Sequence, residues 1–200
     1  MSSETGRTRP YHHGDLRRAL IDTALQILQE EQNWEFTLRE LARRAGVSHA
    51  APYKHFADKR ELLAEVAAVG FRALRQAMEA AAAGHEGEPE ELLAVLGETY
   101  VAFALESPAR FRLMFGPVRD DEPPVPALQS AAGEAFEALR AAVAGSGGGE
   151  VDTRTLAAWS LVHGLATLLI DRRIPGAPSD TAGTRALVAR IIRASVRAPA

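Results

Sequence analysis

Two helix-start signals, one on either side of a glycine, dominate the first third of the sequence. Thr37 and Asp58 each stand three residues before a glutamate, Glu40 and Glu61 respectively. In such a capping box the first side chain accepts a hydrogen bond from a backbone amide of the first turn, and the glutamate carboxylate reaches back. Gly46 lies between the signals, where a tight turn favours a positive φ. The pattern predicts two short helices joined by a turn and followed by a long helix.

The remaining segments carry apolar residues at helical spacing, and no long alternating run of β-branched residues occurs. We expect an all-α chain of about nine helices. A three-helix helix-turn-helix head would be linked by a long fourth helix, from Asp58 to about Ala83, to a larger helical body. The expected domains are residues 1–57 and residues 58–200.

Composition excludes several functional classes. There is no cysteine, so disulfides, thiolate metal sites and cysteine nucleophiles are ruled out. No apolar run approaches the ~18 residues of a membrane span, and Met1 to Pro10 lack the apolar core of a signal peptide. The sequence shows no nucleophile–base pair, metal-ligand cluster or phosphate loop. We therefore expect a cytoplasmic protein that is not an enzyme and needs neither a cofactor nor a metal ion.

Charge is divided unequally along the chain, although the net value is only -3 at pH 7. Residues 1–60 contain ten Lys and Arg against eight Asp and Glu, whereas the rest contains 13 against 18. A mildly basic end beside an acidic body suits a protein that presents one end to a polyanion.

The segment after Gly46 has the composition of a helix that enters the major groove of DNA. It is expected to be a short helix, from His49 to about His55, with a polar and aromatic outward face. Recognition helices of this kind carry hydrogen-bond donors around their N-terminus. Lys59, in the first turn of the next helix, is suited to bind a phosphate together with free backbone amides. The alternative is a helical hairpin that contacts no nucleic acid.

From about residue 14 to residue 65 the sequence resembles the DNA-binding domain of TetR/AcrR-type transcription regulators. The matching residues are Thr37, Ala42, Ala45-Gly46-Val47-Ser48, Tyr53, His55-Phe56, Lys59 and Leu62-Leu63. The resemblance implies phosphate contacts by Thr37, Ser48, Tyr53, His55 and Lys59. It implies that His49, Ala50 and Ala51 face base edges. Arg44, ahead of the turn, and Lys54, on the outward face, complete the expected DNA-contacting set.

Two positions depart from the family pattern. Many relatives carry Gly-Thr or Gly-Ala where this chain has Ala50-Ala51, and a leucine or isoleucine where it has Pro52. Proline lacks an amide hydrogen, so one early helical hydrogen bond is lost and the helix is expected to tighten or tilt. The alanine methyl groups suit contact with thymine methyl groups.

The C-terminal half contains a segment, from Trp159 to Ala166, that is similar to the Trp–His–Gly (WHG) signature of one subgroup of the family. Its His163 is either a hydrogen-bonded core residue or a ligand contact, and the surrounding aromatic residues are either plain core or the lining of a ligand cavity. The candidate ligand-binding residues are Tyr100, Phe103, Phe111, Met114, Phe115, Trp159 and His163.

The last predicted helix carries an apolar stripe formed by Leu187, Val188, Ile191 and Ile192. Members of the family dimerise by packing their last two helices together, so the resemblance implies that this stripe forms a homodimer interface. The alternative is that the stripe belongs to the core of a monomer.

These features together predict a ligand-responsive transcription regulator, usually a repressor, that a small-molecule effector releases from a palindromic operator in double-stranded DNA. The alternatives are an enzyme and a non-specific architectural DNA protein, which should be more basic throughout. Tyr11-His12-His13 forms either an arm along DNA or a segment without fixed structure. Asp120-Asp121-Glu122, among several prolines, is expected to be a solvated loop.

Overall fold

The computed structural model describes residues 13–116, 124–147 and 149–196, which form eight α-helices and one short 3-10 helix, without strands. The helices are α1 (His13–Glu31), α2 (Leu38–Arg44), η1 (Pro52–Lys54, the 3-10 helix), α3 (Lys59–Ala83), α4 (Pro89–Glu106), α5 (Pro108–Phe115), α6 (Pro126–Gly145), α7 (Val151–Ile170) and α8 (Thr181–Val196). The predicted all-α class is confirmed, and the expected count of about nine helices is close.

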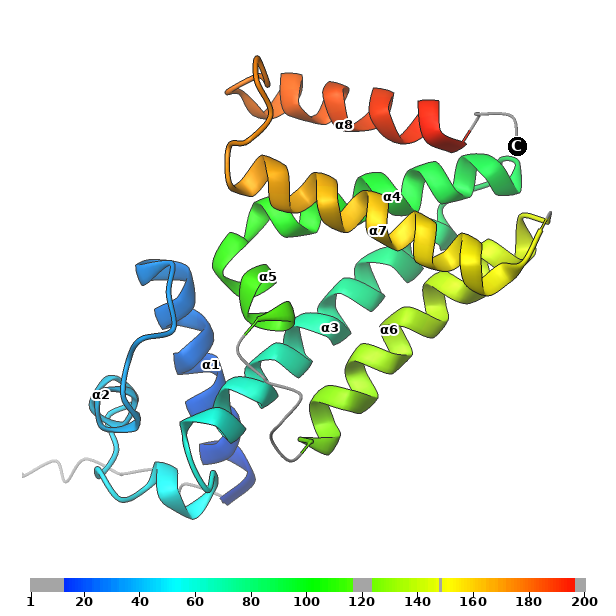
Figure 1. Cartoon of the computed structure of the whole chain (residues 1–200). Coiled ribbons are helices and arrows are strands. Elements are labelled where there is room, and N and C mark those ends of the chain that lie inside the picture. The colour runs from blue at the N-terminus through cyan, green and yellow to red at the C-terminus, as the bar shows by residue number, and fades with distance from the viewer. Residues whose placement is uncertain (1–12, 117–123, 148, 197–200) are drawn as a thin grey trace, which may run out of the picture.

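The helices form a small head and a larger body (Figure 1). The head consists of α1, α2, η1 and the beginning of α3. From there α3 runs into the body, where α6 packs along it. Helices α4, α7 and α8 lie at the end of the molecule away from α2, and the short α5 lies between α1 and the body.

Both helix-start signals of the head act as N-caps. The hydroxyl of Thr37 accepts a hydrogen bond from the amide of Glu40 at 3.1 Å, and Asp58 accepts one from the amide of Glu61 at 2.8 Å. Gly46 has a φ of 68°, as the turn was predicted to require. The expected return contact of Glu40 is wrong, because its carboxylate instead accepts hydrogen bonds from two arginines of its own helix.

The predicted recognition helix is shorter and tighter than expected. Only Pro52–Lys54 is helical, with 3-10 geometry, and residues 49–51 form a turn. Pro52 has no amide hydrogen to donate to the carbonyl of Ser48, so that carbonyl accepts from Ala51 at 2.9 Å, one residue closer. The proline therefore converts the start of the helix into a turn, in line with the predicted tightening.

Two hydrophobic clusters fill the molecule. The head cluster joins α1, α2, Phe56 and the first turns of α3, and it includes Ala109 and Leu113 of α5. The body cluster joins α3, α4, α6, α7 and α8, and it includes Phe111 and Met114 of α5. Both α3 and α5 therefore carry residues of both clusters.

Two further sequence-based expectations concern membrane spans and the segments around Tyr11 and Asp120. No single helix among the described residues is long and apolar enough to cross a membrane, although α4 and α5 together meet that test of length and composition with a bend of 107° between them. Tyr11 and His12 of the expected arm, and the acidic residues 120–122, lie outside the described residues.

The positive φ of Gly46 predicts a specific cost for Gly46→Ala. A Cβ at Gly46 would meet no atom within 4 Å, so the substitution should lower the free energy of unfolding only by the strain of a left-handed alanine, about 1–2 kcal/mol. Urea denaturation measures this. The matched control is Gly133→Ala at an exposed position of α6. A Cβ there also meets no atom within 4 Å, and alanine should stabilise the helix by up to about 1 kcal/mol. Equal effects of the two substitutions would contradict the assignment of strain to Gly46.

Candidate nucleic-acid interface and ligand cavities

Most of the predicted DNA-contacting side chains lie on the outer surface of the head. Tyr53 on η1 is 60% exposed, although large apolar or aromatic side chains are usually buried. The exposed residues are Thr37, Ser48, His49, Ala50, Tyr53 and Lys54, and the half-buried ones are His55 and Lys59. This surface offers hydroxyl, imidazole and ammonium donors, which are the groups that bind DNA phosphates.

The aromatic ring of Phe36 positions one of these donors, Lys59. The ammonium group of Lys59 lies 5.2 Å from the centre of this ring, and Thr37 is the next residue along the chain. The Thr37 hydroxyl uses an oxygen lone pair for the helix cap and keeps its proton for an outside acceptor. Partial burial lowers the pKa of Lys59, opposed by the nearby Glu35.

Two of the predicted DNA-contacting residues, Ala51 and Arg44, are engaged within the protein. Ala51 is only 8% exposed, because the turn before η1 directs it into the head, so it does not present its methyl group to a base edge. Arg44 is bound by carboxylates: its guanidinium donates to Glu30 at 2.8 Å, to Glu31, and to Glu40 at 3.1 Å. Arg44 therefore ties the end of α1 to α2.

The two arginines next to Glu40 hold its carboxyl group in the charged form. Hydrogen bonds from Arg43, and secondly from Arg44, lower the pKa of Glu40 to about 2. The two arginines thus share one carboxylate on the surface of α2. Arg43 remains largely solvent-exposed, whereas Arg44 is fixed between the two helices.

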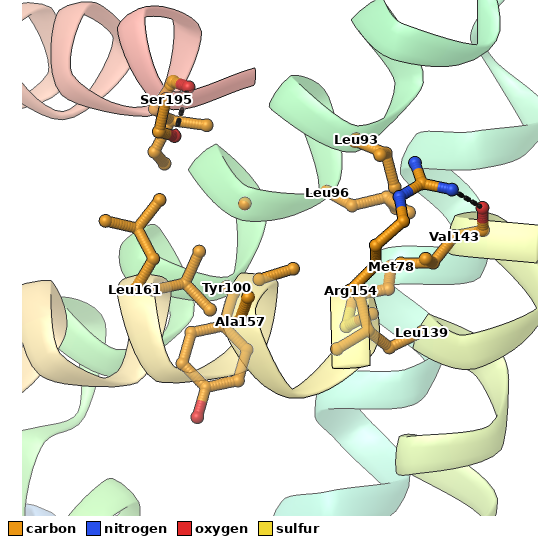
Figure 2. A pocket seen from close by; sticks show the side chains of 14 residues that line it. Met78, Leu93, Leu96, Tyr100, Leu139, Val143, Arg154, Ala157, Leu161 and Ser195 are labelled. Atoms are coloured by element: carbon orange, nitrogen blue, oxygen red, sulfur yellow. Dashed lines mark hydrogen bonds between the residues drawn. The ribbon is translucent and has the colours of Figure 1, made fainter. Parts of the chain in front are cut away.

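A cavity of about 340 Å³, called cavity 1 below, lies in the body (Figure 2). Its lining is mainly aliphatic, with Arg154 at one place and Ser195 at another. Arg154 donates hydrogen bonds to the carbonyl of Val143 at 3.3 Å and to the hydroxyl of Ser146 at 2.7 Å. The lining residues are Met78, Leu93, Leu96, Gly97, Tyr100, Leu139, Val143, Arg154, Ala157, Ala158, Leu161, Val162, Ile192 and Ser195.

A second cavity of about 290 Å³, called cavity 2, lies where the head meets the body. The predicted ligand-binding residues are divided between the two cavities: Tyr100 lines cavity 1, and Phe111, Phe115 and His163 line cavity 2. The other three line neither. Phe103 is buried beneath the guanidinium of Arg110, Met114 packs against Gly70, and the Trp159 ring lies tilted against Phe115 and edge to face with Phe136.

A chain of polar contacts links the two cavities. The indole N–H of Trp159 donates to the Tyr100 hydroxyl at 3.4 Å, and this hydroxyl lies 3.0 Å from Nδ1 of His163. Because an indole only donates, the Tyr100 oxygen accepts from Trp159, and the Tyr100 proton is available to Nδ1 of His163. Burial lowers the pKa of His163, so the ring is neutral at pH 7. Burial likewise raises the pKa of Tyr100.

Sequence reasoning missed most residues of both cavities. It considered aromatic side chains, whereas cavity 1 depends on aliphatic residues and on small ones such as Gly97 and Ala157. It did not assign Trp34 to a ligand site, but Trp34 lines cavity 2 together with α5 and α7. A tryptophan in the connection between α1 and α2 was the available signal. No cluster of three metal-ligating side chains occurs within the described ranges.

The predicted dimer stripe of α8 also requires correction. Val188 is 4% exposed and Ile192 is 2% exposed, because both pack into the body cluster of their own chain. Leu187 and Ile191 are partly buried. Exposed apolar side chains occur instead on α7, where Leu156 is 50% and Leu168 is 46% exposed.

The neutral state of His163 predicts a pH dependence of stability. The unfolded chain takes up a proton at this histidine as the pH falls through about 6.5, whereas the folded chain takes it up only at lower pH. The folded state therefore loses stability as the pH falls through this window. His163→Phe should reduce the proton uptake on unfolding in this window, which urea denaturation between about pH 7 and pH 5.5 measures. An unchanged dependence on pH would show that burial does not hold this ring neutral.

Comparison with known proteins identifies the class of this chain. Residues 93–194 match the family model of the tetracyclin repressor-like C-terminal domain, and residues 20–66 match that of bacterial regulatory proteins of the tetR family. The C-terminal model carries no mention of the Trp–His–Gly subgroup, which stays a prediction.

Individual relatives agree with this assignment. An HTH-type transcriptional regulator of Haemophilus influenzae is 34% identical over 99 residues, 49% of this chain and 48% of the relative. BetI, an HTH-type transcriptional regulator of Agrobacterium fabrum, is 35% identical over 80 residues, 40% of this chain and 39% of the relative. The matched regions thus span half or less of these curated relatives.

The structure also has a solved counterpart of similar length. A protein of unknown function from Rhodococcus sp. RHA1 superposes with a TM-score of 0.76 and 33% identity, covering 94% of this chain and 95% of that one. The fold, the exposed donors of the head and the two family matches lead to one conclusion: the chain belongs to the TetR family of DNA-binding transcriptional regulators.

Proposed function

We propose that this protein is a homodimeric repressor that binds a palindromic operator and is released from it by a small-molecule effector. The observation that carries the DNA-binding part is the set of exposed donors around η1 and Phe36. Tyr53 is exposed on η1, and the ammonium group of Lys59 is held against the ring of Phe36. A duplex laid against this surface would bring phosphates to these donors and base edges to His49 and Ala50.

We assign the effector to cavity 1, which supports an apolar molecule. Its volume, about 340 Å³, falls at the lower end of the range for ligand sites. Aliphatic side chains form most of its wall, and Arg154 and Ser195 supply polar groups that orient a ligand. Because its lining includes Met78 of α3, a helix that begins in the head, occupation of the cavity favours the head position that fits the ligand best.

The outward face of α7 supports a dimer. Leu156, Ser160, Gly164 and Leu168 follow one another at intervals of four residues and so lie on one face. A Cβ at Gly164 would meet no atom of the chain within 4 Å, so the space in front of it is open. Two copies of this helix can approach closely at Gly164, with leucines on either side to bury. A two-fold dimer of this kind places its two heads on the two halves of a palindrome.

The experiment that tests the function has two stages. Duplexes selected from a random pool by the full chain, followed by footprinting, should yield one palindromic site. Genome-wide mapping of bound sites then names the neighbouring genes, whose small-molecule substrates are tested for release of the protein from that site. Recovery of duplexes with no shared sequence would leave a non-specific DNA protein, the alternative to the proposed repressor.

Lys59→Ala should weaken binding to selected and unrelated duplexes by similar factors, because its ammonium group contacts phosphate rather than bases. The slope of log affinity against log salt should become shallower by about one unit per protomer. Fluorescence anisotropy of a labelled duplex at several salt concentrations measures this. The control is Arg185→Ala, an exposed residue on α8, away from the head, which should leave the slope unchanged. Equal slopes for Lys59→Ala and the unmodified chain would remove Lys59 from the interface.

Replacing both Leu156 and Leu168 by glutamate should yield folded monomers. Both side chains are exposed in the protomer, so the substitutions oppose association without disturbing the core. Light scattering measures the mass, and circular dichroism the helix content. In contrast, Ile192→Asp buries a charge in the body cluster and should cost several kcal/mol of stability and unfold the chain. A double variant that remains dimeric would show that the interface lies elsewhere.

A further inference from the structure

Cavity 2 differs from cavity 1 in position and in chemistry. It lies at the contact between the DNA-binding head and the body, and its lining includes Trp34 from the connection between α1 and α2. The body contributes Phe111 and Phe115 from α5, and His163 and Thr167 from α7. A molecule held in this cavity would therefore contact both parts of the protein at once.

Flat rings form much of the cavity wall. The rings of Phe115 and His163 meet edge to face with their centres 4.5 Å apart, and Phe111 lies 5.3 Å from His163. Trp34 adds an indole that is half-buried. Aromatic walls favour a planar aromatic ligand, which gains from both apolar burial and ring–ring contacts. A volume of about 290 Å³ limits that ligand to a small molecule.

One ring nitrogen in this wall has no hydrogen-bond partner among the described residues. His163 lines the cavity, and its Nδ1 is occupied by the Tyr100 hydroxyl. Where that hydroxyl, which accepts from Trp159, donates its own proton to Nδ1, the imidazole carries its proton on Nε2. Nε2 is the ring atom left to bind a ligand, and it binds as a donor. The complementary ligand atom is therefore an acceptor.

Charge in the cavity is balanced within the protein. Arg112, which also lines the cavity, forms an ion pair with Asp171 at 2.5 Å. No carboxylate occurs among the described lining residues. An ionised ligand would have to compete with the Arg112–Asp171 pair or lose its hydration without a new partner, so an uncharged ligand fits best.

We propose that cavity 2 binds an uncharged, planar aromatic molecule through a hydrogen bond from Nε2 of His163 to a carbonyl or similar acceptor, and that the bound molecule ties Trp34 of the head to α5 and α7. The site is separate from the effector cavity assigned above. A ligand that contacts both parts stabilises the head position in which these walls stand together. Binding to this site requires no operator, so its test is independent of the repressor function.

The test uses acetophenone as the probe and ethylbenzene, which has a similar shape but no acceptor, as its control. The chain has two tryptophans, so a proton–nitrogen correlation spectrum contains two indole signals, which Trp34→Phe assigns. Acetophenone should shift the Trp34 signal saturably. Its affinity should exceed that of ethylbenzene by about fivefold, the usual effect of one neutral hydrogen bond. Absence of a saturable shift, or equal affinities, would overturn the proposal.

Two variants locate the probe. His163→Phe keeps a ring but removes the donor, so it should lower the affinity for acetophenone to that for ethylbenzene. Ala157→Phe narrows cavity 1 and lies outside cavity 2, so it should leave the affinity unchanged. Hydrogen exchange of the amides of residues 32–37 should slow when acetophenone binds. Retained affinity in His163→Phe, lost affinity in Ala157→Phe, or unchanged exchange would each contradict the assigned site or its link to the head.

Discussion

Helices α3 and α5 each contribute side chains to both hydrophobic clusters, and this sharing fixes the head on the body. Along α3, Leu62 and Val66 belong to the head cluster, and Phe71 and Leu74 to the body cluster. Helix α5 does the same within eight residues. Gly70 permits the close approach, since a Cβ there would stand 2.7 Å from the sulfur of Met114. Because such close-packed contacts deform little, a shift of α5 moves the head.

Each cavity is lined in part by one of these two shared helices, cavity 1 by Met78 of α3 and cavity 2 by Phe111 of α5. Tyr100 connects the two cavities: its ring lines cavity 1, and its hydroxyl lies 3.0 Å from Nδ1 of His163, which lines cavity 2. In Figure 2 this hydroxyl points away from the labelled aliphatic side chains of cavity 1. A ligand that displaces the Tyr100 ring changes the donor offered in cavity 2. A coupling of the two proposed sites through this hydrogen bond requires that a ligand move the Tyr100 ring, and each ligand would then alter the affinity for the other by the same factor.

Local signals in the sequence were enough to predict the helices but not the cavities. Side-chain caps at Thr37 and Asp58, and the turn at Gly46, act within one helical turn, so their outcome follows from neighbouring residues. Pro52 also acts locally, although its full effect, a 3-10 turn that buries Ala51, exceeded the prediction. Which apolar stripe meets which partner depends on tertiary packing. The periodicity of α8 therefore predicted burial of Val188 and Ile192, but not that their own chain buries them.

Tertiary packing also decides which residues of α7 line a cavity and which lie on an exposed apolar face. His163 faces an aromatic cavity, whereas Gly164, the next residue, faces open space between two exposed leucines. Successive residues of a helix point about 100° apart, so one helix presents the ligand site and the proposed dimer face side by side. A ligand that rotates or shifts α7 at His163 must also move Leu168 against the partner helix. In the proposed dimer, the spacing of the two heads would then respond to occupation of cavity 2 through α7 as well as through α5.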